Sequence, residues 1–305
     1  MEIDGPSFFA KGQNMAEWVL GVIGGSGLYE IAGLANRRWV EVETPWGAPS
    51  DALLMSEIGA CRLVFLPRHG RGHRLSPSDI NFRANIDALK RAGCTDVLSV
   101  SACGSLREDL PPGTFVMVDQ FIDRTFARAK SFFGTGLVAH VSMAEPTCRR
   151  LAGLAGEAAK AAGAPVAMGG TYLVMEGPQF SSLAESKLYR AWGCDVIGMT
   201  NMPEAKLARE AELPYASVAM VTDFDCWHAE VEAVSVTNVL AVLKSNAELA
   251  RAMIETLAGA LQAPRTASPQ GIERALDHAL ITAPEARDPA LIAKLDAVAG
   301  RVLRG

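Results

Sequence analysis

The sequence repeats one arrangement: a short apolar run, a loop of glycine or polar residues, and then a segment with the spacing of an amphipathic helix. The apolar runs are too short for buried helices and end at glycine, proline or polar residues, which is typical of buried strands. The alternation of strands with helices predicts an α/β fold. Strands are predicted at 18–23, 61–66, 97–100, 114–118, 172–175, 196–197 and 217–221, and helices at 79–92, 182–192, 203–211 and 235–261.

The pattern runs without a break from residue 16 to residue 263, which predicts one domain. Residues 1–15 are predicted to be an N-terminal tail. Residues 264–305 begin with a linker-like stretch and then hold two short helical patterns rich in alanine and leucine, separated by Pro284 and Pro289. We expect them to form a C-terminal helical extension that packs on the main domain.

The composition narrows the classes of function. The chain of 305 residues has a formal net charge of −5, which argues against a nucleic-acid-binding protein with a broad basic face. No apolar run approaches the roughly 20 residues that cross a bilayer, and the N-terminus lacks the apolar core of a secretory signal. The six cysteines are scattered without a CxxC pair, which indicates a reducing compartment. We therefore expect a cytoplasmic protein that binds neither membranes nor nucleic acid.

Residues able to bind an anion follow several predicted strands, at the strand ends where α/β folds bind ligands. The glycines of Gly24–Gly27 let backbone N–H groups approach an anion, and Ser26 adds a hydroxyl. The spacing fits neither a dinucleotide site nor a P-loop, and a simple tight turn is the alternative. Arg68 and His69 follow the next strand, where the guanidinium matches phosphate oxygens, and Ser101 follows a third.

The Arg-His-Gly triplet at 68–70 has a second interpretation, because histidine phosphatases use such a triplet with the histidine as nucleophile. That chemistry requires the triplet on the first strand and a second essential histidine deeper in the chain. Here another strand and a glycine-rich loop come first, and His140, His228 and His278 have no matching context. A phosphatase is therefore kept only as a remote alternative.

Two acids, Asp223 and Asp225, follow the apolar strand at 217–221. In an extended chain residues i and i+2 point to the same side, so both carboxylates would face one pocket and exchange protons with a nitrogenous base. A helix cap or a salt-bridged pair is the alternative.

Phe180 would stack on a flat ring or belong to the core, and Cys103 is interpreted as a small buried residue. The sequence has no motif typical of a metal site, so no metal is expected.

Eight segments resemble, in order and with similar spacing, the trimeric purine nucleoside phosphorylase family, and within it the members that act on 5′-methylthioadenosine. They lie between about residues 18 and 260 and are GGSGLY, FLPRHGRGHRLSPSDINFRANI, SVSACGSLRED, DQFIDRT, MAEPTC, MEGPQFSSLAES, GMTNMPEAKLARE and VTDFDCWHAEVEAVSV. The resemblance implies the single-domain mixed-sheet nucleoside phosphorylase fold with flanking helices. It also implies a pentosyltransferase of purine and methionine salvage, which converts 5′-methylthioadenosine and phosphate to adenine and 5-methylthioribose 1-phosphate through an oxocarbenium-like transition state.

The resemblance assigns roles by position. Five residues resemble the phosphate site: Ser26, Arg68, His69, Ser101 and Thr200. Six others resemble the nucleoside pocket: Ala102 and Phe180 as walls, Met199 against the ribose, Val236 and Val239 around the 5′-methylthio group, and His140 lent by a neighbouring subunit. A homo-oligomer is therefore expected, either a trimer or a dimer of trimers. No cofactor is expected, because inorganic phosphate is a co-substrate.

The two acids resemble the residues that bind the purine. Asp223 would face N7 and give or share a proton as the base departs, and Asp225 would contact the 6-amino group. A carboxyl in a pocket lined by Phe and Met should have a raised pKa, which suits an acid. Members that prefer 6-oxopurines carry Asn at the position of Asp223, so this Asp favours adenine. A broader or 6-oxopurine phosphorylase, acting on methylthioinosine, inosine or guanosine, is the alternative, and a non-catalytic nucleoside-binding protein is a further one.

Overall fold

The computed structural model describes residues 17–25, 27–228, 236–261 and 264–304, with the backbone alone described for 236–240. Within these residues one mixed sheet of 11 strands runs in the order β2-β3-β4-β1-β5-β10-β9-β7, and β11, β6 and β8 continue it from β5. The strands are β1 Val19–Gly24, β2 Ala35–Val40, β3 Leu53–Ile58, β4 Cys61–Pro67, β5 Asp96–Ser105, β6 Phe115–Val118, β7 Gln120–Asp123, β8 Val166–Met168, β9 Thr171–Val174, β10 Val196–Gly198 and β11 Tyr215–Asp223.

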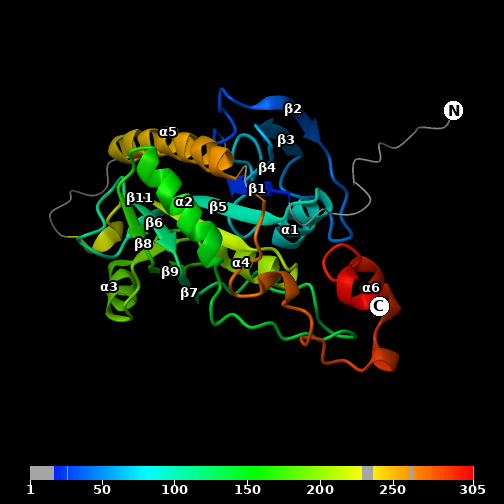
Figure 1. Ribbon diagram of the computed structural model, residues 1–305. Helices are drawn as coiled ribbons and strands as arrows, with labels where there is room; N and C mark the ends of the chain where they lie inside the picture. The colour runs from blue at the N-terminus through cyan, green and yellow to red at the C-terminus, as the bar shows by residue number, and fades with distance from the viewer. Residues whose placement is uncertain (1–16, 26, 229–235, 262–263, 305) are drawn as a thin grey trace.

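Helices cover both faces of this sheet (Figure 1). Leu20 and Val22 of β1 pack in the cluster that contains α2 and α5, whereas Val19 and Ile23 pack in the cluster that contains α1 and α4. Since alternate residues of a strand face opposite sides, an apolar strand such as β1 needs a helical layer on each side. The α-helices are α1 Phe82–Arg91, α2 Arg149–Ala161, α3 Leu183–Ala191, α4 Asn201–Glu210, α5 Val236–Ala260, α6 Pro289–Lys294 and α7 Gly300–Leu303. No helix of the described ranges is both long and apolar enough to cross a bilayer.

The central strand β5 has a gap along one edge. β11 pairs with β5 from Val97 to Gly104 and so occupies the whole of one edge. On the other edge, β1 pairs only as far as Ser99, and β10 pairs only with Gly104 and Ser105. Residues 100–103 therefore have no partner strand on that edge among the described residues, which leaves a gap in the strand pairing in the middle of the sheet.

Three sequence predictions need correction. The strand predicted to end at Val100 continues to Ser105, because β11 and then β10 pair with it. The helix predicted at 79–92 begins at Phe82 and is capped by Asn81, whose side chain accepts from the Ala84 N–H. The strand predicted at 217–221 extends to Asp223, so this acid lies within the strand end.

The last forty residues are tied to the main body. Leu276, Leu295 and Val298 are buried in the same apolar cluster as α1 and α4. Arg301 donates to Glu212 at the end of α4, with Nε at 2.8 Å from the carboxylate. The segment 279–282 also forms a short antiparallel ribbon with 138–140, since the N–H groups of 140 and 281 donate across it at 2.9 Å.

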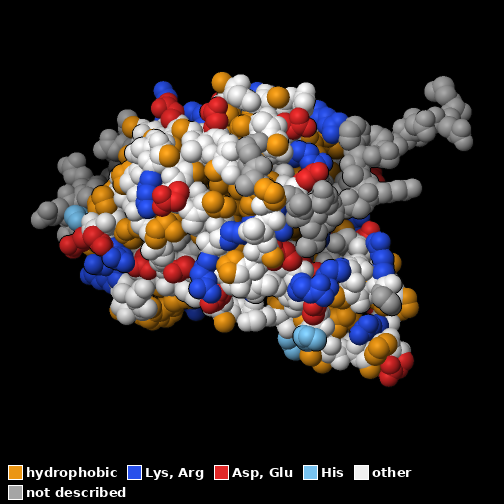
Figure 2. Space-filling view, viewed as in Figure 1, with side chains coloured by type: hydrophobic (Ala, Val, Ile, Leu, Met, Phe, Trp, Pro, Cys, Tyr) orange, Lys and Arg blue, Asp and Glu red, His pale blue; other side chains and the backbone are white. Residues whose placement is uncertain are grey.

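Charged side chains of both signs are interspersed over the face shown in Figure 2. On the surface of the protein Arg71 pairs with Asp51 at 2.8 Å and Arg107 pairs with Asp195 at 2.9 Å, and each arginine is about half exposed. Each such pair contributes at most about 1 kcal/mol to stability, because water screens it. The buried ion pairs described below are of a different kind.

Candidate active site

The predicted site residues gather around the gap beside β5. Ala102 is exposed there, although Ser101 and Cys103 on either side of it are buried. The ends of β1, β4 and β11 border the same gap, and β10 ends it by pairing with Gly104. Ligands of open α/β sheets bind at such a break, outside the carboxyl ends of the strands.

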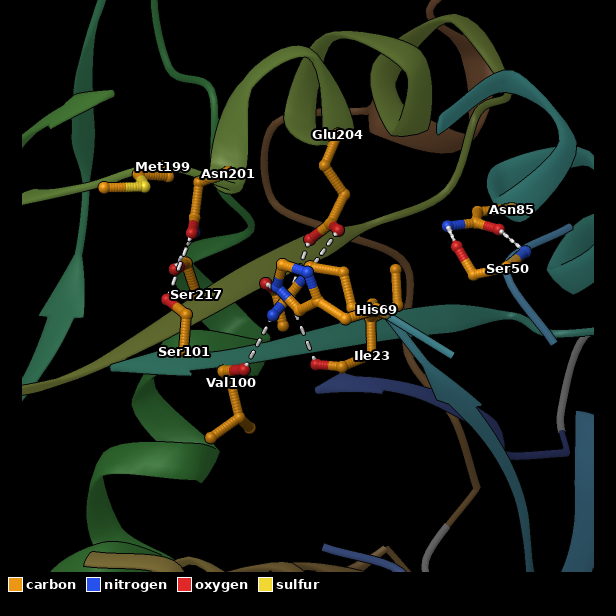
Figure 3. A network of polar contacts seen from close by, with 12 residues as sticks. Ile23, Ser50, His69, Asn85, Val100, Ser101, Met199, Asn201, Glu204 and Ser217 are labelled. Atoms are coloured by element: carbon orange, nitrogen blue, oxygen red, sulfur yellow. Dashed lines mark hydrogen bonds and ion pairs between the residues drawn. The ribbon is translucent and has the colours of Figure 1, made fainter. Parts of the chain in front are cut away.

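Arg68 leaves the end of β4 and is only 2% exposed. Its guanidinium donates to both carboxylate oxygens of Glu204, at 2.9 and 3.1 Å, to the carbonyls of Ile23 and Val100, and to the hydroxyl of Ser99 (Figure 3). These bonds use four of the five N–H hydrogens of the side chain. A direct contact between Arg68 and phosphate therefore stays a prediction that depends on the remaining hydrogen of Nη1.

His69 follows Arg68 and is half-buried. Its Nδ1 lies 2.9 Å from the carbonyl oxygen of Leu75, and its ring stacks on His73 at 4.2 Å. Burial, with the nearby Arg68 charge, lowers the pKa of His69 to about 4. In the neutral ring Nδ1–H donates to the carbonyl, so Nε2 carries a lone pair and accepts hydrogen bonds. His69 would thus meet a phosphate as an acceptor.

Arg128 joins two loops of the site and was missed by the sequence analysis. It donates to the carbonyls of Glu176, Met199 and Met202, each at 2.6 Å, and its Nε donates to the Glu176 carboxylate at 3.2 Å. Although burial opposes it, hydrogen bonds from Ser78 and from two backbone N–H groups hold the pKa of Glu176 below its usual range. Glu176 lies in a segment that carries the family resemblance, but nothing in the sequence indicated that Arg128 is its partner.

The hydrogen bonds of Arg128 position the loop that carries Met199 and Thr200. Met199 packs on Gly177, where a Cβ would come within 2.5 Å of the methionine sulfur, so this position requires glycine. Thr200 is buried just before α4. Phe180 is 84% exposed, which excludes the core role considered for it and leaves its ring available to a ligand.

The two acids lie beside Gly104 at the edge of the gap, although not in one extended strand. β11 ends at Asp223, and a 3₁₀ turn over Asp225–Trp227 follows. The N–H of Asp225 donates to Asp223 Oδ1 at 2.8 Å, and the Thr222 hydroxyl lies 2.7 Å from Asp223 Oδ2. A Cβ on Gly104 would lie 3.1 Å from Asp223 Oδ1 and 3.3 Å from the Cβ of Asp225.

Asp225 is half-buried beside Asp223. Burial, with the charge of Asp223 nearby, raises its pKa. Its Oδ2 is buried and has no hydrogen bond of ordinary geometry among the described residues, although the Ser186 hydroxyl lies close enough to oppose the rise in pKa. A buried acceptor so weakly bonded is costly, and a donor on a bound ligand would satisfy it.

Four predicted residues are not among those placed at the gap. His140 is exposed on the ribbon with 279–282, where its N–H donates to the Ala279 carbonyl at 2.9 Å. Its proposed contact with a neighbouring subunit stays a prediction. Ser26 and the side chains of Val236 and Val239 lie outside the described residues.

Known proteins match the chain over nearly its whole length. The phosphorylase superfamily matches residues 19–258. S-methyl-5′-thioadenosine phosphorylase of Cereibacter sphaeroides is 64% identical over 94% of this chain and 99% of its own, and that of Bradyrhizobium diazoefficiens is 60% identical over 95% and 100%. The chain belongs to the S-methyl-5′-thioadenosine phosphorylase family. The family assignment confirms the predicted resemblance and points away from the histidine-phosphatase alternative.

Solved structures of the family confirm the predicted fold. A methylthioadenosine phosphorylase from an antarctic soil metagenomic library superposes with a TM-score of 0.87, at 45% identity over 93% of this chain and 99% of that one. The Schistosoma mansoni methylthioadenosine phosphorylase in complex with tubercidin gives a TM-score of 0.76, at 37% identity over 84% and 95%. This member of the family therefore has the mixed-sheet nucleoside phosphorylase fold.

A surface pocket of about 470 Å³ lies outside the gap. Its lining includes Glu41, Glu43 and Asp51, and none of the predicted site residues that the structure describes. Three carboxylates repel an anion, with Arg74 as the lining cation. The gap beside β5 stays the candidate for a phosphate-dependent reaction.

The close approach of both acids to Gly104 gives a testable prediction. Gly104→Ala should force both acidic side chains outward by a few tenths of an ångström, because the new methyl group would lie 3.1 Å from Asp223 Oδ1, 3.2 Å from Ile197 Cγ2 and 3.3 Å from the Asp225 Cβ. We expect kcat/KM to fall about tenfold or more, since catalytic groups tolerate little misplacement. Gly153→Ala is the matched control, because nothing lies within 4 Å of a Cβ there. Equal activity of the two variants in a steady-state assay would contradict the placement of the acids.

Proposed function

We propose that this protein is a pentosyltransferase that cleaves 5′-methylthioadenosine with inorganic phosphate, giving adenine and 5-methylthioribose 1-phosphate. The observation that carries the proposal is full-length identity of 60 to 64% to proteins of that name. The gap in the pairing of β5 supports it, because Arg68 donates to the Val100 carbonyl there and Asp223 and Asp225 lie beside Gly104. The proposal includes no cofactor, and inorganic phosphate is the second substrate.

The reaction exchanges one bond at C1′ of the ribose for another. The bond from C1′ to N9 of adenine breaks, its electron pair leaves with the base, and a phosphate oxygen forms the new bond to C1′. The departing base takes up a proton at N7, for which Asp223 is the proposed partner, while Asp225 accepts from the 6-amino group. Ser26, Arg68, His69, Ser101 and Thr200 hold the phosphate, and Ala102, Phe180 and Met199 border the nucleoside.

Phosphate dependence is the first test. We expect adenine release from 5′-methylthioadenosine to require inorganic phosphate and to give a sugar phosphate in equal amount. The measurement is base and sugar phosphate quantified by chromatography, with and without phosphate. Equal release in phosphate-free buffer, with free methylthioribose as product, would show a hydrolase and refute the proposal.

The 5′ end of the substrate is the second test. Val236 and Val239 are proposed to line the methylthio group, and a small apolar group in a fitted pocket changes binding by about 1–3 kcal/mol. We therefore expect 5′-methylthioadenosine to exceed adenosine by about 10- to 200-fold in kcat/KM. Val236→Asp should erase or invert this preference, with Val236→Ile as the apolar control. Adenosine as the better substrate of the unaltered protein would refute the pocket.

The protein is further proposed to act in purine and methionine salvage in the cytoplasm as a homotrimer or a dimer of trimers. The ribbon of 138–140 with 279–282 supports an assembly in which His140 reaches a neighbouring site, since the C-terminal extension holds it in an exposed position.

Light scattering gives the subunit number. Mixing an Asp223→Asn variant with a His140→Ala variant tests the shared site: mixed oligomers recover activity if His140 acts across the interface, and do not if it acts within its own subunit.

A further inference from the structure

A chain of buried hydrogen bonds leads from Ser101 into the core (Figure 3). The Ser101 hydroxyl lies 3.1 Å from Oδ1 of Asn201, the first residue of α4. Nδ2 of Asn201 donates to the Tyr215 hydroxyl at 3.2 Å and to the Ser217 hydroxyl. The Tyr215 hydroxyl in turn lies 2.9 Å from Oε1 of Glu204, the carboxylate that pairs with Arg68. Every member of this chain is buried.

The carboxylate of Glu204 fixes the direction of every bond in this chain. A carboxylate paired with a guanidinium only accepts, so the Tyr215 hydroxyl must donate to it. The Tyr215 oxygen can then only accept from Asn201, which requires the NH₂ group of Asn201 on that side. The amide oxygen of Asn201 consequently faces Ser101 and accepts its hydroxyl proton.

Ser101 therefore has its single hydrogen committed to the interior of the protein. One lone pair of its oxygen can accept from the buried Tyr172 hydroxyl, which lies within reach of Ser101, and another remains. Toward a ligand at the gap Ser101 is therefore a hydrogen-bond acceptor. Hydrogen phosphate carries a P–OH group that can donate to such an acceptor. Sulfate has the same shape and the same charge of minus two but has no hydrogen to donate.

We propose that Asn201, Tyr215 and Glu204 act as positioning residues that make Ser101 an acceptor, so that the site selects hydrogen phosphate over anions without a proton. The proposal rests on the proposed function, which makes phosphate a substrate. His69 does not oppose this selection, because its Nδ1 faces the Leu75 carbonyl and its Nε2 has no hydrogen to donate to sulfate. Burial that lowers the pKa of His69 to about 4 keeps that nitrogen free of a proton.

The test is the ratio of the dissociation constants of sulfate and phosphate, measured by calorimetry in mildly alkaline buffer where both anions carry two charges. For the unaltered protein we expect phosphate to bind at least about tenfold more tightly, the factor for one hydrogen bond to a charged group. Ser101→Ala should weaken phosphate and leave sulfate nearly unchanged or improved, so the ratio falls toward one. If the two anions bind equally to the unaltered protein, or if Ser101→Ala weakens both by the same factor, Ser101 is not an acceptor and the proposal is wrong.

Asn201→Ala tests the positioning role. It frees the Ser101 hydroxyl to donate to an anion, so sulfate should bind several-fold more tightly and the ratio should fall. Ser217→Ala is the matched control, because Tyr215 still fixes the Asn201 amide, and the ratio should not change. A purely structural role for Asn201 would weaken both anions together and leave the ratio as it was, which would overturn the proposal. Ser101→Ala decides alone if Asn201→Ala does not fold.

The turnover assay and the calorimetric measurement of anion binding together separate this inference from the proposed function. Failure of phosphate to support cleavage of 5′-methylthioadenosine would refute the phosphorylase assignment, whatever the two anions do. Normal turnover with equal affinity for phosphate and sulfate would refute the acceptor role of Ser101 alone.

Discussion

Asp223→Asn is expected to lower kcat on 5′-methylthioadenosine by about 10²- to 10⁴-fold, the usual contribution of a positioned acid. Bond cleavage places negative charge on the departing base, and an amide has no carboxyl proton to neutralise it. The local structure should survive. The amide oxygen can still accept the Asp225 N–H, and the Thr222 hydroxyl can turn to the Cys103 carbonyl at 3.1 Å. Steady-state kinetics and a thermal melt measure both effects.

Substrate preference separates a chemical role of Asp223 from a structural one. The amide can donate to O6 or accept from N1–H of a 6-oxopurine, so turnover of methylthioinosine or inosine should rise relative to the unaltered protein. Asp225→Asn should affect adenine substrates less, because Asp225 is proposed to contact the amino group and not the departing charge. A well-folded Asp223→Asn protein with unchanged preference between amino- and oxopurines would refute the assignment, and a common loss of stability in both variants would favour structural acids.

Glu204→Ala is expected to lower the free energy of unfolding by about 3–5 kcal/mol, the cost of leaving a buried charge without its partner. Arg68 and Glu204 are 2% and 1% exposed, so water cannot replace the lost carboxylate, and the Tyr215 hydroxyl loses its acceptor as well. Denaturant unfolding measures the change. Arg71→Ala breaks the exposed pair with Asp51 and should cost less than about 1 kcal/mol.

A double variant sharpens this test. Replacing both Arg68 and Glu204 with leucine removes the two charges together, and apolar replacements of buried pairs are often nearly neutral. Arg68→Leu/Glu204→Leu should therefore be more stable than Glu204→Ala, although it has lost two charged hydrogen-bonding groups. A double variant that is no more stable than the single one would show that the uncompensated charge is not the cause.

The sequence was most informative about local structure. The apolar runs of β1 and β4 and the helix after Ser182 were predicted because each depends on its own residues and, for α3, on the capping box of Ser182 with Glu185. The strand β2 was missed because its side chains are mostly exposed and show no apolar pattern. The helix α2 was missed because alanines form much of its buried face.

Long-range partners could not be predicted from sequence periodicity. Arg68 was identified as a cation at a strand end, but Glu204 lies 136 residues away, and only the fold brings the two together. Ser101 was placed in a loop because the small residues after Val100 resemble a turn, whereas pairing by two other strands keeps β5 extended. The extended conformation expected for Asp223 and Asp225 was wrong for a local reason, since the Asp225 N–H donates to the Asp223 side chain where the strand ends and a 3₁₀ turn follows.

The missing partner along one edge of β5 also makes the strand a reporter of ligand binding. Amide hydrogens of β5 that point toward β11 are held by a continuous ladder of hydrogen bonds and should exchange slowly with deuterated solvent. Those of residues 100–103 that point toward the gap face no strand among the described residues and should exchange faster. A central strand of a large sheet would then show alternate fast and slow amides. A ligand bound at the gap should slow the exchange of the fast amide hydrogens, so deuterium uptake along this one strand would measure occupancy of the site without any turnover.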